Sequence, residues 1–528
     1  MSRFARSGWR SASRRNIMGA VSASEVHDML DRAIPAFERE LGRDWPNRIG
    51  GREDAGGRRF DLVSPLDRSL RLGRFVEADR AAVERAVAAA RKAAPGWSAL
   101  SWRERVAALR RVADLIDRRK YDLGIAALLE VGKSRIEAIG KAEEAVDLVR
   151  YYCDEMDRNQ GFDRPMAQAN PAETTRTVLK PYGTFAVIAP FNFPVALSAA
   201  MMTGALLGGN TVVFKPAPES AFTGALLADA FEAADLPEGA VNVLAGEPAG
   251  AMLVEHPGID GIVFTGSHAV GMEILRKAAS GPFARPVIAE MGGKNPAYVA
   301  RSADPALAAE GVMRSAFGLQ GQKCSACAVA YVHESVSESF MSALMERSRA
   351  LPVGDTRRRD VTIGPVIDEA AGRRFDEAAH AAASAGKVAL GGKRLTGGVY
   401  DGGAFVAPTV ATELPADHPL VREELFLPFL AVQRFSDLGE ALRRGNAVRY
   451  GLTAGFYGED EAELRQFLDR CEAGVLYANR RSGATTGAWP GIQSFCGWKG
   501  SGTTGKGGLG PYYVPQFMRE QSQTLWRV

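Results

Sequence analysis

The sequence predicts an α/β protein built on open, mostly parallel β-sheets. The main observation is an alternation of short apolar runs with helical stretches in the middle of the chain. The apolar runs cover 185–190, 211–214, 241–244 and 261–264, and the helical stretches cover 195–207, 220–234, 248–255 and 269–279. Near-continuous apolar strands that alternate with helices of this length are typical of a parallel sheet covered on both faces.

A second alternation predicts a second α/β lobe. It starts near Val287, and its expected strands lie at 287–293, 296–299, 328–332, 405–410 and 474–479, with a helix over 336–350. Residues 75–160 have apolar residues at three- and four-residue intervals, which predicts helices. We therefore expect two sizeable lobes and a minor element. Ligands in open α/β sheets bind beyond the carboxyl ends of the strands.

Composition excludes several classes of protein. The 528 residues are 46% hydrophobic and 24% charged, as in an ordinary globular protein. A largely disordered chain, a collagen-like rod and a small disulfide-rich scaffold are thereby excluded. The 65 basic residues nearly balance the 62 acidic ones, so the charge gives no reason to expect a nucleic-acid partner.

The small positive excess is concentrated at the N-terminus. Residues 1–17 contain five arginines and no acidic residue. An Arg- and Ser-rich stretch without acids can be an organellar transit peptide. The interpretation we favour is a disordered extension, or a start assigned too early, with Met18 as the true start.

The cysteines and histidines indicate the cellular setting. Five cysteines without a preceding signal-peptide core predict a reduced, cytoplasmic protein. Six scattered histidines show no ligand spacing, so we expect no metal site. The uncharged segment between Lys180 and Lys215 is interrupted by Pro, Asn and Gly, so we expect no membrane-spanning helix.

Cys324 is the candidate nucleophile. It lies where a Gly/Gln-rich loop enters an apolar segment, in SAFGLQGQKCSACAV (315–329). A lone cysteine is more often a core residue. The spacing to Cys327 also matches a redox pair, but the context of a small thioredoxin-like domain is missing. A nucleophile requires a base and an oxyanion donor nearby.

Two residues can supply these functions. Glu290 ends an apolar strand before two glycines, where partial desolvation raises a carboxyl pKa toward the range of a general base. Asn192 lies in APFNFP, within the uncharged segment, and its neutral amide can donate to a developing oxyanion. Taken one at a time, a surface carboxylate and a turn asparagine are the simpler explanations.

Taken together, these segments resemble the aldehyde dehydrogenase superfamily from about residue 75 to 520. Seven motifs occur in the family's order: APFNFP (189–194), TVVFKP (211–216), FTGS (264–267), EMGGKN (290–295), GQKC (321–324), REELFLPF (422–429) and GWKGSG (497–502). The resemblance implies an aldehyde dehydrogenase-like α/β fold. Its parts are an open parallel-sheet cofactor lobe, an α/β catalytic lobe and a small oligomerisation arm.

The resemblance also implies roles for particular residues. Cys324 matches the nucleophile, Glu290 the general base and Asn192 the oxyanion donor. On the cofactor side, Lys215 matches the lysine at the adenosine ribose and Glu424 the carboxylate at the nicotinamide ribose. The other expected cofactor contacts are Pro190, Phe191, the phosphate-side turn at Gly266 and Ser267, and Phe426 beside the nicotinamide. The mechanism implied is oxidation of an aldehyde through a cysteine thiohemiacetal and thioester.

Within the superfamily, the resemblance points to the 1-pyrroline-5-carboxylate (glutamate γ-semialdehyde) dehydrogenases. It is carried by EVGK (130–133), EEAVDLVRYY (143–152), AEMGGKN (289–295), SAFGLQGQKCSAC (315–327) and the anchor-loop segment 479–495. It implies that the backbone of Gly487 and Ala488 and the Ser325 hydroxyl bind the substrate carboxylate. Phe495 would pack on the aliphatic chain, with Lys323 and Glu144 near the site. Lys323 or a helix-end dipole could also lower the thiol pKa of Cys324.

Several departures leave alternatives open. Cys496 and Leu427 stand where relatives have glycine, and the anchor loop is about three residues longer. NAD-preferring relatives have a glutamate three residues after the cofactor lysine. Here that position is Pro218, and the carboxylate of Glu219 follows one residue later, which weakens the case for NAD over NADP. NAD is still the expected cofactor, and NADP remains an alternative. The substrate alternatives are succinate or 2-oxoglutarate semialdehyde. A CoA-acylating enzyme and a catalytically silent relative are less favoured because Cys324, Glu290 and Asn192 are intact.

The expected domains follow the resemblance. Residues 18–152 and 179–289 are expected to bind NAD(P), residues 290–502 to form the catalytic domain, and residues 153–178 with 503–528 to form the oligomerisation arm. Such an arm cannot bury its apolar side alone, so a homodimer or higher homo-oligomer is expected.

Overall fold

A seven-stranded sheet forms the centre of the first lobe in the computed structural model, which describes residues 22–483 and 489–526. Five neighbouring strands are parallel and two at one edge are antiparallel. In spatial order they are β12 (Val287–Met291), β11 (Gly261–Gly266), β8 (Thr184–Ile188), β9 (Thr211–Lys215), β10 (Val241–Val243), β2 (Asn47–Ile49) and β3 (Arg52–Asp54). The four predicted apolar runs thus become adjacent parallel strands. Strands β8 and β9 are buried on both faces, as the uninterrupted apolar pattern predicts.

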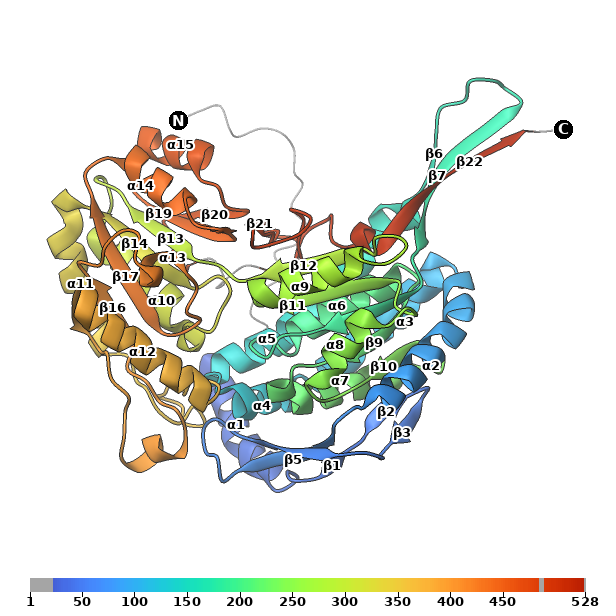
Figure 1. Cartoon of the computed structure of the whole chain (residues 1–528), viewed down its shortest axis with the longest axis horizontal. Coiled ribbons are helices and arrows are strands. Elements are labelled where there is room, and N and C mark those ends of the chain that lie inside the picture. Colours follow the sequence, from blue (N-terminus) through green and yellow to red (C-terminus); the bar gives the residue numbers. More distant parts are fainter. Residues whose placement is uncertain (1–21, 484–488, 527–528) are drawn as a thin grey trace.

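Helices pack on this sheet and on one another (Figure 1). They are α1 (Ala23–Glu38), α2 (Arg80–Ala99), α3 (Trp102–Arg118), α4 (Lys120–Val131), α5 (Arg135–Arg158), α6 (Ala196–Leu207), α7 (Ala221–Glu232), α8 (Pro248–Glu255) and α9 (His268–Ala279). Helix α5 begins with a capping box formed by Ser134 and Glu137, which satisfies free amide groups of its first turn. The N-terminal part adds a small sheet of β1 (Asp44–Trp45), β5 (Arg71–Val76) and β4 (Arg59–Val63), which the sequence pattern did not predict.

A second seven-stranded sheet forms the other lobe. Its spatial order is β15 (Lys387–Leu390), β16 (Thr409–Thr412), β17 (Phe429–Phe435), β14 (Cys327–His333), β13 (Asn295–Val299), β19 (Thr453–Tyr457) and β20 (Val475–Ala478). The helices of this lobe are α10 (Pro305–Phe317), α11 (Ser337–Arg349), α12 (Glu369–Ala385), α13 (Pro419–Arg422), α14 (Leu438–Asn446) and α15 (Glu461–Arg470). Only β15 runs antiparallel to its neighbour, so the expected second parallel α/β layer is present.

Two predicted strands differ from the structure. The segment 287–293 was expected to open the second series, but β12 pairs with β11 and belongs to the first sheet. The second series therefore starts at β13. The segment 405–410 gives a strand only from Thr409, because Pro408 has no amide hydrogen for a sheet ladder. Ala404 and Val406 form isolated bridges instead.

A three-stranded antiparallel sheet projects from the body (Figure 1). Strand β7 (Glu173–Pro181) lies between β22 (Met518–Trp526) and β6 (Asp163–Pro165), and β7 and β22 pair over nine residues. The two chain segments that lead into this sheet, one before β6 and one before β22, belong to the first lobe. Helix α5 continues to Arg158 and buries Cys153 and Met156 there. The turn η6 (Val514–Phe517) packs into the same core.

Shorter elements complete the described residues. They are the 3₁₀ turns η1 (Gln160–Phe162), η2 (Pro218–Ser220), η3 (Gly318–Gly321), η4 (Glu334–Val336) and η5 (Gly398–Gly402), and the pair β18 (Tyr450–Gly451) and β21 (Trp498–Lys499). The arginine-rich residues 1–17 lie outside the described residues. Among the helices of the described residues, none is both long and apolar enough to cross a membrane.

Candidate active site

Cys324 sits at the end of a loop with unusual backbone geometry. The turn η3 contains Leu319 and Gln320 at φ 50° and 55°, followed by Gly321 at 66°. Residues other than glycine rarely adopt this left-handed conformation, which costs about 1–3 kcal/mol per residue and persists only where the surrounding structure imposes it. A side chain at Gly321 would lie 2.1 Å from the carbonyl oxygen of Leu427, so only glycine fits there. The loop before the cysteine is therefore tightly constrained.

Hydrogen bonds from both lobes hold this loop. The Gln320 side chain donates to the carbonyl of Gly132 at 3.0 Å, and the Leu319 amide donates to Glu137 at 3.1 Å. The side-chain amide of Asn295 donates to the carbonyl of Cys324 at 2.7 Å. These contacts provide the surrounding structure that a strained segment requires.

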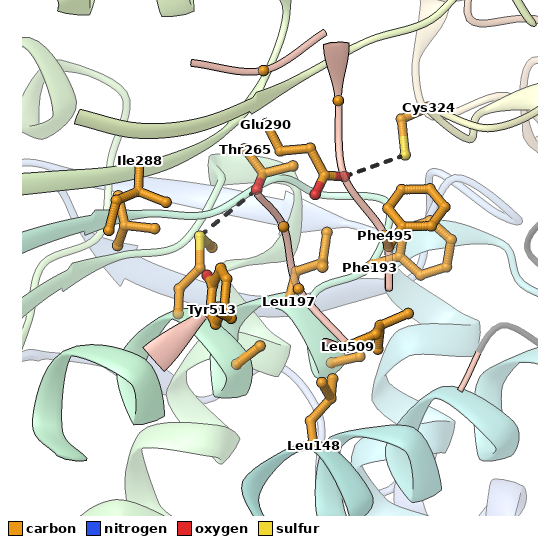
Figure 2. Close-up of a pocket in the computed structure, with 18 of the residues that line it drawn as sticks. Leu148, Phe193, Leu197, Thr265, Ile288, Glu290, Cys324, Phe495, Leu509 and Tyr513 are labelled. Atoms are coloured by element: carbon orange, nitrogen blue, oxygen red, sulfur yellow. Dashed lines mark hydrogen bonds between the residues drawn. The ribbon is translucent and has the colours of Figure 1, made fainter. Parts of the chain in front are cut away.

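Glu290 faces Cys324 directly. The Cys324 Sγ atom lies 3.9 Å from Glu290 Oε1, and Figure 2 shows the two side chains pointing toward each other. Glu290 projects from β12 near its carboxyl end, where parallel strands place ligand-binding groups. Burial raises the pKa of Glu290 to about 7. A carboxylate with this pKa can accept a proton near neutral pH.

The thiol pKa differs from the sequence-based suggestion. Burial, followed by the negative charges of Glu290 and Glu424, raises the pKa of Cys324 well above its ordinary value. Lys323, which was expected to lower it, is itself buried, and burial lowers the pKa of its ammonium group. In this arrangement the proton of Cys324 is retained until a base such as Glu290 accepts it.

Asn192 lies beside the nucleophile loop. It follows β8 and is only 4% exposed, as expected from its place in the uncharged segment. Its side-chain nitrogen donates to the carbonyl of Gln322 at 2.9 Å. An amide nitrogen carries two hydrogens, so one remains for another acceptor.

The predicted cofactor residues gather at the carboxyl end of the first sheet and across from it. Lys215 ends β9 and is 6% exposed, and its ammonium group makes no hydrogen bond or ion pair within the described residues. Burial lowers the pKa of Lys215, while the nearby charges of Glu219 and Glu247 oppose this shift. Gly266 ends β11, and Ser267 caps α9 by accepting from the Val270 amide. A buried, unpaired ammonium group at a strand end fits a polar ligand.

Glu424 and Phe426 approach this region from the second lobe. Glu424 accepts from the Gly293 amide at 2.9 Å, and burial raises its pKa to about 7. Phe426 has φ 58° and meets Phe191 edge to face, with ring centroids 5.9 Å apart. Phe191 follows Pro190 directly after the end of β8, so this contact joins the two lobes. One predicted cofactor residue of each lobe, Phe191 and Phe426, is thus in contact with the other.

A cavity opens next to Cys324 and Glu290. Phe193 and Phe495 lie together beside Cys324, and Leu509 and Tyr513 line a more distant wall (Figure 2). Most of the lining is apolar. The predicted Phe495 and Glu144 are among the lining residues.

The other residues predicted to bind the substrate do not line this cavity or lie outside the described residues. Ser325 is 1% exposed, and its hydroxyl has no hydrogen-bond partner within the described residues. Neither Ser325 nor Lys323 belongs to the cavity lining. Gly487 and Ala488 fall in segment 484–488, outside the described residues.

The sequence motifs did not identify Lys141, Lys294 or Asn295 as site residues, but the structure places all three at or near the candidate site. Lys141 on α5 lines the cavity. Lys294 is buried, and its ammonium group donates to the carbonyl of Leu420 at 2.8 Å. Asn295 holds the carbonyl of Cys324, as described above. Lys294 and Asn295 follow the two glycines of EMGGKN. Polar residues at the start of a buried strand are unusual, and this pattern could have identified both as candidate site residues.

The described residues contain no group of three or more His, Cys, Asp or Glu side chains arranged to hold a metal ion. A thiol, a carboxyl of raised pKa and a buried amide form the candidate reactive set. Together with a polar-ligand region at the strand ends, they suit nucleophilic chemistry on a carbonyl beside a nucleotide cofactor.

Comparison with known proteins gives the class. The profile of the Aldehyde dehydrogenase family matches residues 52–522. The chain belongs to the aldehyde dehydrogenase family.

Particular relatives are more specific. The 1-pyrroline-5-carboxylate dehydrogenase of Geobacillus thermodenitrificans is 35% identical over 496 residues, which cover 93% of this chain and 94% of that protein. The corresponding protein of Bacillus mycoides is 35% identical over 509 residues, covering 94% and 96%. The crystal structure of 1-pyrroline-5-carboxylate dehydrogenase from Thermus with bound NAD superposes with a TM-score of 0.91 at 34% identity, covering 97% of this chain and 98% of that one. The fold is thus an aldehyde dehydrogenase fold, as the sequence predicted.

Proposed function

We propose that this chain is an NAD-dependent dehydrogenase that oxidises L-glutamate γ-semialdehyde to L-glutamate in proline degradation. The observation that carries the chemistry is the pairing of Cys324 with Glu290 at 3.9 Å beside the cavity. The choice of substrate is supported by the relatives, which are named 1-pyrroline-5-carboxylate dehydrogenase and match over more than nine-tenths of the chain. The proposed substrate is the open-chain form of 1-pyrroline-5-carboxylate.

The geometry supports the following roles for the residues of the site. Cys324 gives its proton to Glu290, which releases it to solvent before the hydrolytic step. The Cys324 sulfur attacks the aldehyde carbon, while the Asn192 amide and the Cys324 backbone amide stabilise the oxyanion. NAD, when bound, accepts the hydride that leaves the tetrahedral adduct. Glu290 then takes a proton from the water that attacks the thioester, which releases the carboxylic acid and restores the thiol.

The residues of the first lobe fit a nucleotide cofactor. We propose that residues 18–152 and 179–289 form the cofactor domain, in which Lys215 contacts the adenosine ribose and Gly266 and Ser267 lie near the phosphates. Pro190, Phe191, Glu424 and Phe426 would enclose the nicotinamide side. The unpaired buried ammonium of Lys215 supports this assignment. The negative charge of Glu219 close to Lys215 supports NAD, because it would repel a 2′-phosphate.

Residues 290–502 are proposed as the catalytic domain, with the anchor loop, Ser325 and Phe495 at the substrate. The arm is proposed to join subunits of a homodimer or larger homo-oligomer. Strand β22 is an edge strand of the arm sheet, and Leu525 is 59% exposed on it. Exposed apolar edge strands are suited to pairing with another chain. The five cysteines are all free, which suits the reducing cytoplasm.

The test is steady-state reduction of NAD and NADP, followed at the nicotinamide absorbance. Glutamate γ-semialdehyde is compared with succinate semialdehyde and propanal, with Cys324→Ala as the inactive control. We expect glutamate γ-semialdehyde to lead by more than tenfold in kcat/KM, about 1.4 kcal/mol of discrimination. Equal turnover of all three aldehydes would contradict the proposed substrate, and no turnover would contradict the proposed activity.

A further inference from the structure

The charges on the cavity wall are few. Among the described lining residues, the charged side chains are Lys141, Glu144, Glu290 and Lys506. Glu290 faces Cys324, and Lys506 is exposed to solvent. Lys141 and Glu144 lie nearly one turn apart on α5 and form an ion pair. This ion pair is polar, whereas the other residues of α5 that line the cavity, Leu148 and Tyr152, are mainly apolar.

The ion pair retains unused hydrogen-bonding capacity. The Lys141 ammonium donates to Glu144 Oε2 and lies 5.0 Å from the ring centroid of Phe193. An ammonium group has three donors, so two remain. Glu144 Oε1 accepts no hydrogen bond from the described residues. The two side chains are only 19% and 9% exposed, so a ligand there would meet them with little competing water.

The surroundings of the pair are cationic. Lys133 and Lys323 are buried nearby and act electrostatically on each other, and Lys141 acts on both. The Lys133 ammonium lies 4.5 Å from the Phe193 ring centroid, on the ring that Lys141 also approaches. Of the two acids in this group, Glu137 already accepts from Leu319 and Ser134. Burial lowers the pKa of Lys133 to about 7 and also lowers that of Lys323, so a carboxylate bound here would be stabilised by favouring the charged forms of these ammonium groups.

We propose that Lys141 is a specificity-determining residue that binds the carboxylate of the aldehyde substrate, with Glu144 facing the ammonium group of the same molecule. The proposal rests on the proposed function, because it requires an aldehyde that carries an amino-acid head. Phe193 connects this pair to the reacting atoms, since it contacts the Lys141 ammonium and lies beside Cys324.

The experiment uses three aldehydes that differ by one group at a time. L-glutamate γ-semialdehyde has a carboxylate and an ammonium group, 5-oxopentanoate has only the carboxylate, and pentanal has neither. For Lys141→Met, we expect kcat/KM to fall about 10- to 100-fold with both carboxylate-bearing aldehydes, mainly through KM, as for loss of a charge-assisted hydrogen bond. With pentanal we expect less than about a twofold change, since pentanal has no carboxylate for Lys141 to bind.

Two further variants separate the roles of the pair. Glu144→Gln is expected to lower kcat/KM for glutamate γ-semialdehyde and to leave the value for 5-oxopentanoate within about twofold, since only the former has an ammonium group. Lys141→Arg, which keeps the positive charge, is expected to restore most of the preference for carboxylates. The matched control is Lys120→Met, because Lys120 pairs with Glu143, the residue before Glu144 on α5, and does not line the cavity.

The outcomes are distinct. If the wild-type enzyme does not prefer glutamate γ-semialdehyde to pentanal, the proposed substrate fails before any variant is compared. If the wild-type enzyme shows this preference and Lys141→Met keeps it, the inference about Lys141 alone is overturned. Equal losses with all three aldehydes would also overturn it, because they would show that Lys141 has a general structural role.

Discussion

The side-chain amide of Asn192 donates to the carbonyl of Gln322 across the boundary between the two lobes, over 2.9 Å. Asn192 follows a strand of the first sheet, whereas Gln322 precedes Cys324 by two residues in the second lobe. This bond places the candidate oxyanion donor next to the candidate nucleophile. The reactive set is therefore assembled only where the lobes meet.

Removal of the thiol tests the nucleophile. Cys324→Ala is expected to lower kcat by at least about 10⁴-fold, as when a covalent nucleophile is removed. Cofactor binding should persist, because the proposed cofactor residues Lys215 and Gly266 lie at strand ends of the first sheet and Cys324 does not. Stopped-flow NAD reduction and a separate cofactor-binding titration measure the two properties. A variant that keeps substantial turnover would exclude Cys324 as the nucleophile.

Removal of the amide tests the oxyanion donor. Asn192→Ala is expected to lower kcat about 10²- to 10³-fold, the usual effect of losing one such donor. The effect should appear in kcat more than in KM, since the donor acts on charge that develops during reaction. Steady-state kinetics at saturating cofactor measure this split. A change confined to KM would instead indicate a role in ground-state binding.

The raised pKa of Glu290 predicts a pH dependence of activity. A general base must be unprotonated, so kcat should rise with pH through about 7 and then level off. Glu290→Gln should remove this rise and lower kcat about 10²- to 10⁴-fold. If the wild-type and variant profiles had the same shape, the titrating group would be another residue.

The same pKa predicts a pH dependence of stability with a definite sign. The folded pKa of about 7 exceeds the ordinary value of 4.5, so the folded state binds the proton more tightly. Burial of this carboxylate therefore costs stability as pH rises from about 4.5 to 7 and at all higher values. Glu290→Gln should raise the melting temperature at pH 8 relative to wild type and change it little near pH 4.5. Calorimetry at the two pH values provides the measurement.

The glycine before the nucleophile offers a test with a matched control. Gly321→Ala would place a methyl group 2.1 Å from the Leu427 carbonyl, whereas Gly505→Ala, at nearly the same φ, meets nothing within 4 Å. Both substitutions carry the left-handed penalty of about 1–2 kcal/mol. We expect Gly505→Ala to lose stability only and Gly321→Ala to lose activity as well. Similar activity in the two variants would show that the clash is absorbed without moving Cys324.

The sequence was informative where local pattern decides the structure. Uninterrupted apolar runs predicted β8 and β9, and the motifs located Cys324, Glu290 and Asn192. The pattern could not assign β12 to a sheet, because apolar strands look alike whichever neighbour they pair with. It also gave no sign that Lys141 lines the cavity, since a charged residue on an amphipathic helix normally points to solvent. Contacts across distant segments determine these features.

Hydrogen bonds such as those from Gln320 and Asn192, with a small apolar cluster of Val131, Phe193 and Leu319, join the lobes at the nucleophile loop, whereas most of each larger hydrophobic core lies within one lobe. Heating can therefore separate the lobes slightly before either core melts. Catalytic inactivation should then occur at a lower temperature than the loss of helical circular dichroism. A bound ligand that touches both lobes should bring the two temperatures together.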